Sequence, residues 1–257
     1  MPLPPGFPEI VLLFAGLAVG SFLNVCIHRL PLKQSVVYPG SRCPSCGYEL
    51  RWYDNLPVLS YVLLRGRCRS CGKGISLQYP LIEVVTAVVF LAHWYAFGPT
   101  AMLAPRLVFG CALIVLFMID FEHQILPDVI TLPGIVIGLV FSVVLPPGPL
   151  MSLLGLLLGG GVLWAIAELW FRLRNVEAMG FGDVKMLAMV GAWLGVKMVL
   201  MTFVLSSMMG GLIGVVLIAS RRADMATKVP FGTMLAVAAL IASLYGGPLL
   251  AWYLSRF

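Results

Sequence analysis

The chain is short of charged residues, and this shortage excludes an ordinary soluble protein. Only 11% of its 257 residues are charged, whereas 60% are hydrophobic. The mean hydropathy is +0.99. A soluble domain carries charge on roughly a quarter of its residues. Because the apolar residues are spread along the whole chain, the composition predicts a membrane protein with several spans rather than one anchor.

Several motifs of common enzyme classes are also missing. There is no H-E-x-x-H of a metalloprotease, no G-x-S-x-G of a serine hydrolase and no G-x-G-x-x-G of a dinucleotide-binding fold. The segment Met1 to Glu9 has no Lys or Arg, so a cleaved signal peptide is not predicted. The first apolar run, Ile10 to Ile27, is therefore interpreted as a retained span.

The apolar runs predict an all-α polytopic membrane protein with about eight transmembrane helices. A bilayer requires about 17–25 residues per helix. The expected spans are 10–27, 81–97, 103–119, 126–145, 150–171, 184–200, 201–219 and 230–254. A tight turn near Lys197 separates the sixth and seventh, and joining them would give seven spans. Three regions follow: a first helix at 1–27, a cytoplasmic loop domain at 28–80 and a membrane bundle at 81–257.

Basic residues predict the orientation of these spans. Cytoplasmic loops are rich in Lys and Arg. In the eight-span arrangement fourteen of the 17 basic residues fall on one side, eight of them in the 28–80 loop. Arg106, Lys197 and Arg256 remain for the other side. We therefore expect the 28–80 loop in the cytoplasm and both termini outside.

The loop contains two C-x-x-C pairs, each followed by glycine. Their members are Cys43, Cys46, Cys68 and Cys71. Four thiolates at this spacing are typical of a structural zinc ribbon, which leaves no open coordination position for catalysis. The alternative is two disulfides or free thiols, but a cytoplasmic location disfavours disulfides. The basic charge of the loop is explained by anionic lipid, so no nucleic-acid partner is expected.

Two aspartates lie at the edges of apolar runs. Asp120 ends the run Phe117-Met118-Ile119, and Asp183 follows Gly180-Phe181-Gly182. Ionisable groups near a bilayer are costly and usually functional. The orientation above brings both to the cytoplasmic edge, where two carboxylates sharing one proton would form an aspartic protease site.

Other interpretations of these acids stay open. Asp128 follows Pro127 and is interpreted first as a cap or first-turn residue of the next helix, with a catalytic role as the alternative. Asp183 could likewise cap a helix after a plain turn. Asp120 and Asp183 could also be proton or ion sites of a membrane transporter, although such sites more often lie near the midplane between broken helices.

At this point the chain resembles the prepilin peptidases, also called type IV leader peptidases. The resemblance covers nearly the whole chain in order. It rests on the segments Gly20–Val25 with Arg29–Pro31, the two cysteine pairs, Asp54–Ser60, Tyr79–Glu83, Asp120–Asp128, Gly180–Lys185 and Pro230–Gly232. Thr233 stands where a proline is usual in that family.

The resemblance implies an activity and its site residues. Asp120 and Asp183 would be the catalytic pair, with Asp128 as runner-up and Gly180, Gly182 and Lys185 in support. The enzyme would remove the basic leader of prepilins or pseudopilins at the cytoplasmic face of the bacterial inner membrane. It would then methylate the new N-terminus with S-adenosylmethionine.

Two further expectations concern how substrates are held. Asn24 and Glu83 could line the methyl-donor site, or could equally be hydrogen-bonding residues that fix the loop. The substrate helix could pack on small residues, and acids could attract its basic leader. The small residues are Gly155, Gly159, Gly160 and Gly161, and the acids are Glu122 and Glu177. The oligomeric state is not indicated.

Overall fold

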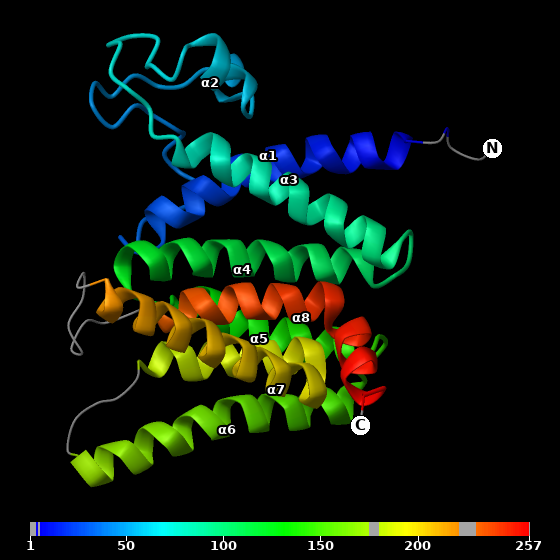
Figure 1. Cartoon of the computed structure of the whole chain (residues 1–257). Coiled ribbons are helices and arrows are strands. Elements are labelled where there is room, and N and C mark those ends of the chain that lie inside the picture. Colours follow the sequence, from blue (N-terminus) through cyan, green and yellow to red (C-terminus); the bar gives the residue numbers. More distant parts are fainter. Residues whose placement is uncertain (1–3, 5, 175–179, 221–229, 257) are drawn as a thin grey trace. The chain divides into compact units, whose positions relative to one another are not determined.

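This computed structural model describes residues 4, 6–174, 180–220 and 230–256, and in them the regular secondary structure is helical apart from two isolated β-bridges in the loop. Glu177, Arg221, Arg222 and Lys228 lie outside it. The chain divides into two compact units, Met1–Val115 and Leu116–Phe257. The helices (Figure 1) are α1 (Phe7–Arg29), η1 (Trp52–Asn55), α2 (Leu59–Leu63), α3 (Gln78–Phe97), α4 (Leu103–His123), α5 (Asp128–Ser142), α6 (Pro149–Arg174), α7 (Phe181–Ala219) and α8 (Phe231–Leu254).

The all-α membrane architecture expected from the sequence is confirmed, and the number of about eight helices holds approximately. Six helices of the described chain, α1, α3, α4, α6, α7 and α8, are long and apolar enough to cross a bilayer. The 15-residue α5 is apolar but shorter. The helix α4 continues to His123, so Asp120 lies inside its last turn rather than just beyond it.

In the first unit, α1 and α3 pack closely because glycines face the neighbouring backbone. A Cβ atom added at Gly16 would lie 2.5 Å from Ala87 Cα, and one at Gly20 would lie 2.6 Å from Glu83 Cα. Small residues that let backbones approach are the usual means of packing helices in a membrane. The contact holds together the two ends of the loop domain, since residues 30–77 connect these helices.

In the second unit, α7 breaks at Gly195 and the chain reverses direction there. Gly195 has φ 77° and ψ −178°, which is incompatible with a helix. Before the break, Gly182 faces Leu126 at the start of α5; after it, Met198 contacts Gly246 near the end of α8. Figure 1 shows the two parts of α7 side by side. The predicted break between 200 and 201 was therefore real but placed five residues too late.

The glycines of α6 serve the bundle itself. A Cβ added at Gly155 would lie 2.5 Å from the Gly191 carbonyl oxygen, and one at Gly159 would lie 2.5 Å from the Leu187 carbonyl oxygen. These two positions are therefore occupied by α7, and the idea that they pack a substrate helix was wrong. An added Cβ at Gly161 would meet no atom within 4 Å.

Candidate active site and metal centre

Asp120 and Asp183 lie in the same region of the second unit, on two different helices. Asp120 lies in the last turn of α4 and is 5% exposed. Asp183 lies in the first turn of α7 and is half-buried. Gly182, which precedes Asp183, and Gly232, which faces Asp120, both pack against Leu126. The fold thus brings the end of α4 and the start of α7 to the same side chain.

The first turn of α8 holds the Asp120 side chain. The Thr233 backbone N–H donates to Asp120 Oδ2 over 2.6 Å, and the Thr233 hydroxyl donates to the same oxygen over 2.9 Å. A Cβ added at Gly232 would lie 2.9 Å from Asp120 Cγ. The absence of a side chain at Gly232 therefore allows the carboxylate to reach the helix.

The two glycines before Asp183 have different structural roles. The Gly180 carbonyl accepts the Asp183 N–H over 3.1 Å and forms the turn that begins α7. A Cβ at Gly182 would lie 2.9 Å from Leu126 Cβ. Leu126 of the same chain therefore fills the space beside Gly182. Because Leu126 also faces Gly232, one side chain packs against the starts of both α7 and α8.

Asp128 has a different partner. It is the first residue of α5, with Pro127 at the N-cap, so it is a first-turn residue rather than the cap. Lys185 Nζ lies 2.7 Å from Asp128 Oδ1 and 2.8 Å from Oδ2, and the aspartate side chain is 56% exposed. Lys185, expected as a supporting residue of the active site, therefore ties α7 to α5. Of the two acids Asp120 and Asp128, only the first interacts electrostatically with Asp183.

Two carboxylates at helix ends can perform acid–base chemistry when they lie close together. Two like charges that approach closely do not both ionise, so such a pair retains one proton. One carboxylate can then accept a proton from water while the other donates one to a carbonyl oxygen.

The four loop cysteines form a cluster suited to a metal ion. Their sulfur atoms all lie within 4.8 Å of one another. Cys43 Sγ is 3.9 Å from Cys71 Sγ, and Cys46 Sγ is 4.0 Å from Cys68 Sγ. A tetrahedral zinc ion with Zn–S bonds of about 2.3 Å places its ligands about 3.8 Å apart. The geometry fits a four-thiolate centre, and all four cysteines are free of disulfides.

The backbone of the loop prepares this cluster. The Gly47 N–H donates to the Cys43 carbonyl and the Gly72 N–H to the Cys68 carbonyl, each over 2.9 Å, so the two turns are alike. Both glycines have positive φ, 72° and 69°. Hydrogen bonds from the Ser45 and Cys46 backbones lower the pKa of Cys43 to about 6. A thiol that is ionised at neutral pH is ready to bind a cation.

The pKa of Cys71 is shifted in the opposite direction to that of Cys43. A backbone contact with Lys73 lowers the pKa of Cys71, but burial and the other three cysteines outweigh it and raise the value to about 11. A divalent cation at the centre of the cluster would stabilise all four thiolates and displace this proton.

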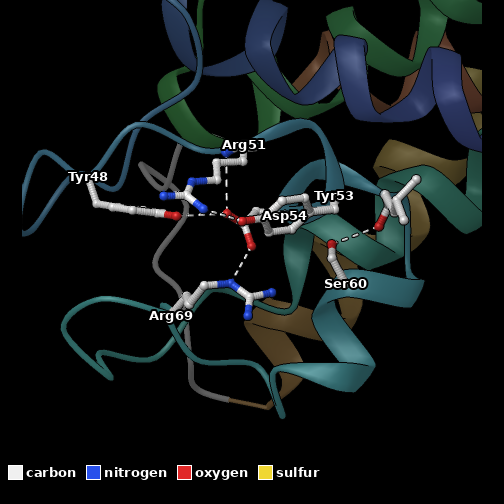
Figure 2. Close-up of polar contacts among 7 residues, drawn as sticks. Tyr48, Arg51, Tyr53, Asp54, Ser60 and Arg69 are labelled. Atoms are coloured by element: carbon white, nitrogen blue, oxygen red, sulfur yellow. Dashed lines mark hydrogen bonds and ion pairs between the residues drawn. The ribbon is translucent and has the colours of Figure 1, made fainter.

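Asp54 joins the two cysteine turns (Figure 2). Its side chain is 3% exposed and accepts hydrogen bonds from Arg69 Nε over 2.6 Å, Tyr48 Oη over 3.1 Å and the Arg51 N–H over 3.3 Å. Arg69 lies within the second C-x-x-C pair, and Tyr48 follows the first. Burial opposes ionisation of Asp54, but these bonds outweigh it and hold the pKa of the carboxyl below its usual value.

A cavity of about 950 Å³ lies in the first unit beside the cysteine cluster. Asn24 and Glu83 line it, together with Asp54, Arg29 and Tyr79. Asn24 Nδ2 donates to the Tyr79 carbonyl over 3.0 Å, and Glu83 Oε2 accepts the Val58 N–H over 2.7 Å. Each therefore attaches a helix to another segment of the unit, and each also faces a space large enough for a small molecule.

Sequence reasoning assigned no role to two residues of these sites. Thr233 was noted only as a departure from a familiar pattern, and Asp54 only as part of a motif. The available signals were a polar residue in the first turn of an apolar helix and an acid within a basic loop. Neither signal specifies a partner, because both contacts join segments distant in sequence.

Comparisons with known proteins agree with this arrangement. Residues 14–97 match the bacterial peptidase A24 N-terminal domain, and residues 107–215 match the type IV leader peptidase family. The chain is 38% identical to a prepilin leader peptidase/N-methyltransferase of Pseudomonas putida, covering 92% of this chain and 90% of that protein. A protein of the same name from Pseudomonas aeruginosa is 37% identical, covering 93% and 91%.

A relative from a third organism carries the same name. The prepilin leader peptidase/N-methyltransferase of Myxococcus xanthus is 41% identical over 85% of this chain and 66% of that protein. No solved structure matches the chain. The transporter alternative finds no support in these matches. With two family models along its length and relatives that align with almost all of it, the chain belongs to the type IV leader peptidase family.

Proposed function

We propose that this protein is a membrane-embedded aspartic endopeptidase that removes the leader peptide of prepilins or pseudopilins and then methylates the new N-terminus. The observation that supports the proposal is that Asp120, at the end of α4, and Asp183, at the start of α7, lie beside glycines that both pack against Leu126. The relatives named above, which align with almost the whole chain, support the substrate and the second activity.

The peptidase reaction follows from the chemistry of the pair. Asp120 and Asp183 share one proton, so a bound water can lose a proton to one carboxylate while the other polarises the scissile carbonyl. Each acid or base contribution supplies about 10²–10⁴-fold in rate. The position of the pair at helix ends suits a substrate that is cut where its basic leader meets its apolar helix.

Single substitutions test the catalytic pair. Asp120→Asn and Asp183→Asn should each abolish leader release in purified protein, while membrane insertion and the unfolding temperature remain near those of the unaltered chain. Asp128→Asn is the matched control, since it removes an exposed acid paired with Lys185. Release is followed by the N-terminal mass of a purified prepilin. Full activity of either variant of the pair would refute the assignment.

The two cofactors have separate places in the first unit. The four cysteines would hold a zinc ion whose role is structural, because a complete thiolate shell leaves no open position. The cavity beside Asn24 and Glu83 would hold S-adenosylmethionine, which supplies an electrophilic methyl group. A buried carboxylate such as Glu83 suits ribose hydroxyls, and Arg29 suits the carboxylate of the methionine part.

The methyl-donor site has its own test. Glu83→Gln keeps the shape of the side chain and removes its charge. We expect weaker binding of S-adenosylmethionine by calorimetry and less N-methylation by mass spectrometry, with leader release retained. Equal methylation by the variant and the unaltered chain would exclude Glu83 from that site.

The protein would act in the bacterial inner membrane with its active site and zinc loop at the cytoplasmic face, as the basic loops predict.

A further inference from the structure

The start of α8 provides a specific receptor for the Asp120 carboxylate. Thr233 is the third residue of this helix, where a backbone N–H has no carbonyl partner within the helix. Both this N–H and the Thr233 hydroxyl donate to Asp120 Oδ2. Two donors on one oxygen favour the ionised form of a carboxylate over the protonated form. The two hydrogen bonds therefore stabilise a negative charge on Asp120.

Asp183 has no comparable support. Among the residues that the structure describes, none donates a hydrogen bond to its carboxylate, which interacts instead with the charge of Asp120. Asp183 does lie in the first turn of α7, where the helix dipole favours a negative charge. That interaction is weaker than two direct hydrogen bonds to an ionised group. The two environments therefore differ in the charge state that they favour.

We infer that Thr233 is a positioning residue that places the single proton of the pair on Asp183 and keeps Asp120 ionised. This inference rests on the proposed function and assigns the two chemical roles within it. Asp120 is the general base and Asp183 is the general acid.

The assignment gives a balanced reaction. The water oxygen bonds to the scissile carbonyl carbon as its proton passes to Asp120 and the proton of Asp183 passes to the carbonyl oxygen. The resulting gem-diol then collapses. The C–N bond breaks, Asp120 returns its proton to the leaving amine, and one diol hydroxyl returns a proton to Asp183. Both carboxyl groups end the cycle in their starting states.

The other titratable groups described at the end of α4 and the starts of α5 and α7 already pair with one another. Glu122 and His123, in the last turn of α4, lie 3.9 Å apart and are both exposed. Lys185 of α7 is bonded to Asp128 of α5. In the described part of α8, the first turn brings no charged side chain. Among the described residues, Asp120 is thus the titratable group that acts on Asp183 across helices.

The test is the pH profile of leader cleavage by Thr233→Val, which deletes the hydroxyl and keeps the side-chain shape. The acidic limb of kcat/KM reports protonation of the base. Loss of one donor should move this limb upward by about one pH unit. The basic limb should stay in place, because the proton lost there belongs to Asp183. Thr233→Ser keeps the hydroxyl and should therefore restore the original profile. Thr233→Ala lacks the hydroxyl and the branched side chain, and it should shift the acidic limb in the same direction as Thr233→Val.

Each result is decisive. Movement of the basic limb alone would place the proton on Asp120 and overturn the inference. An active variant with both limbs unmoved would show that the hydroxyl does not support the base, which also overturns it. In either case the proposed function would survive. An unaltered chain that releases no leader at any pH would instead overturn the proposed function, and the inference with it.

Discussion

The substitution Gly232→Ala should disable the active site without removing any functional group. The added Cβ would lie 2.9 Å from Asp120 Cγ, 2.9 Å from Leu126 Cδ1 and 3.0 Å from Asp120 Oδ2. Carbon atoms in contact normally lie about 3.5–4.0 Å apart. The Asp120 carboxylate must therefore retreat by roughly 0.6–1.1 Å, because Leu126 blocks the other side. A misplacement of about 1 Å can cost about 10²-fold in rate.

The assay is the initial rate of leader release from a purified prepilin, compared across variants in one detergent. Gly247→Ala is the matched control, since it lies in the same helix and its added Cβ would meet no atom within 4 Å. We expect kcat/KM to fall by about 10²-fold for Gly232→Ala, equal to about 2.7 kcal/mol of transition-state stabilisation, and to remain unchanged for the control. Unfolding temperatures separate loss of activity from loss of fold. Wild-type rates for Gly232→Ala would refute the assignment of this site to Asp120.

Three other predictions concern the metal centre, the loop and the bundle. Cys46→Ser should lower the metal content measured by elemental analysis from about one zinc per chain towards none, and an unchanged content would exclude the four-thiolate site. Because the pKa of Asp54 is lowered in the folded loop, its ionised form stabilises the fold above about pH 4, and this contribution is lost as the pH falls further. In metal-free protein, the stability gap between the unaltered chain and Asp54→Asn should therefore shrink below about pH 4; a constant gap would contradict it. Gly191→Ala should destabilise the bundle by about 1–3 kcal/mol in thermal unfolding, because its Cβ would overlap the Gly155 backbone, whereas Gly161→Ala should not.

The local chemistry of this protein can be read from its sequence because it depends on composition and short spacing. The apolar runs predicted a helical membrane bundle, and the helices of the described chain agree. Two C-x-x-C pairs predicted a four-thiolate cluster, whose sulfur atoms lie within 4.8 Å of one another. Even the break in α7 was expected near Lys197, since glycine is poorly suited to the interior of a helix.

The partners of the acidic residues were decided only by tertiary structure. From the sequence, Asp120 and Asp128 were alternative first members of a pair; packing brings Asp120 to Thr233 and Asp183, and Asp128 to Lys185. A hydrogen bond between residues 113 positions apart leaves no periodic trace in a single chain. It exists because α4 and α8 are packed so that the carboxylate of one reaches the open N–H groups of the other.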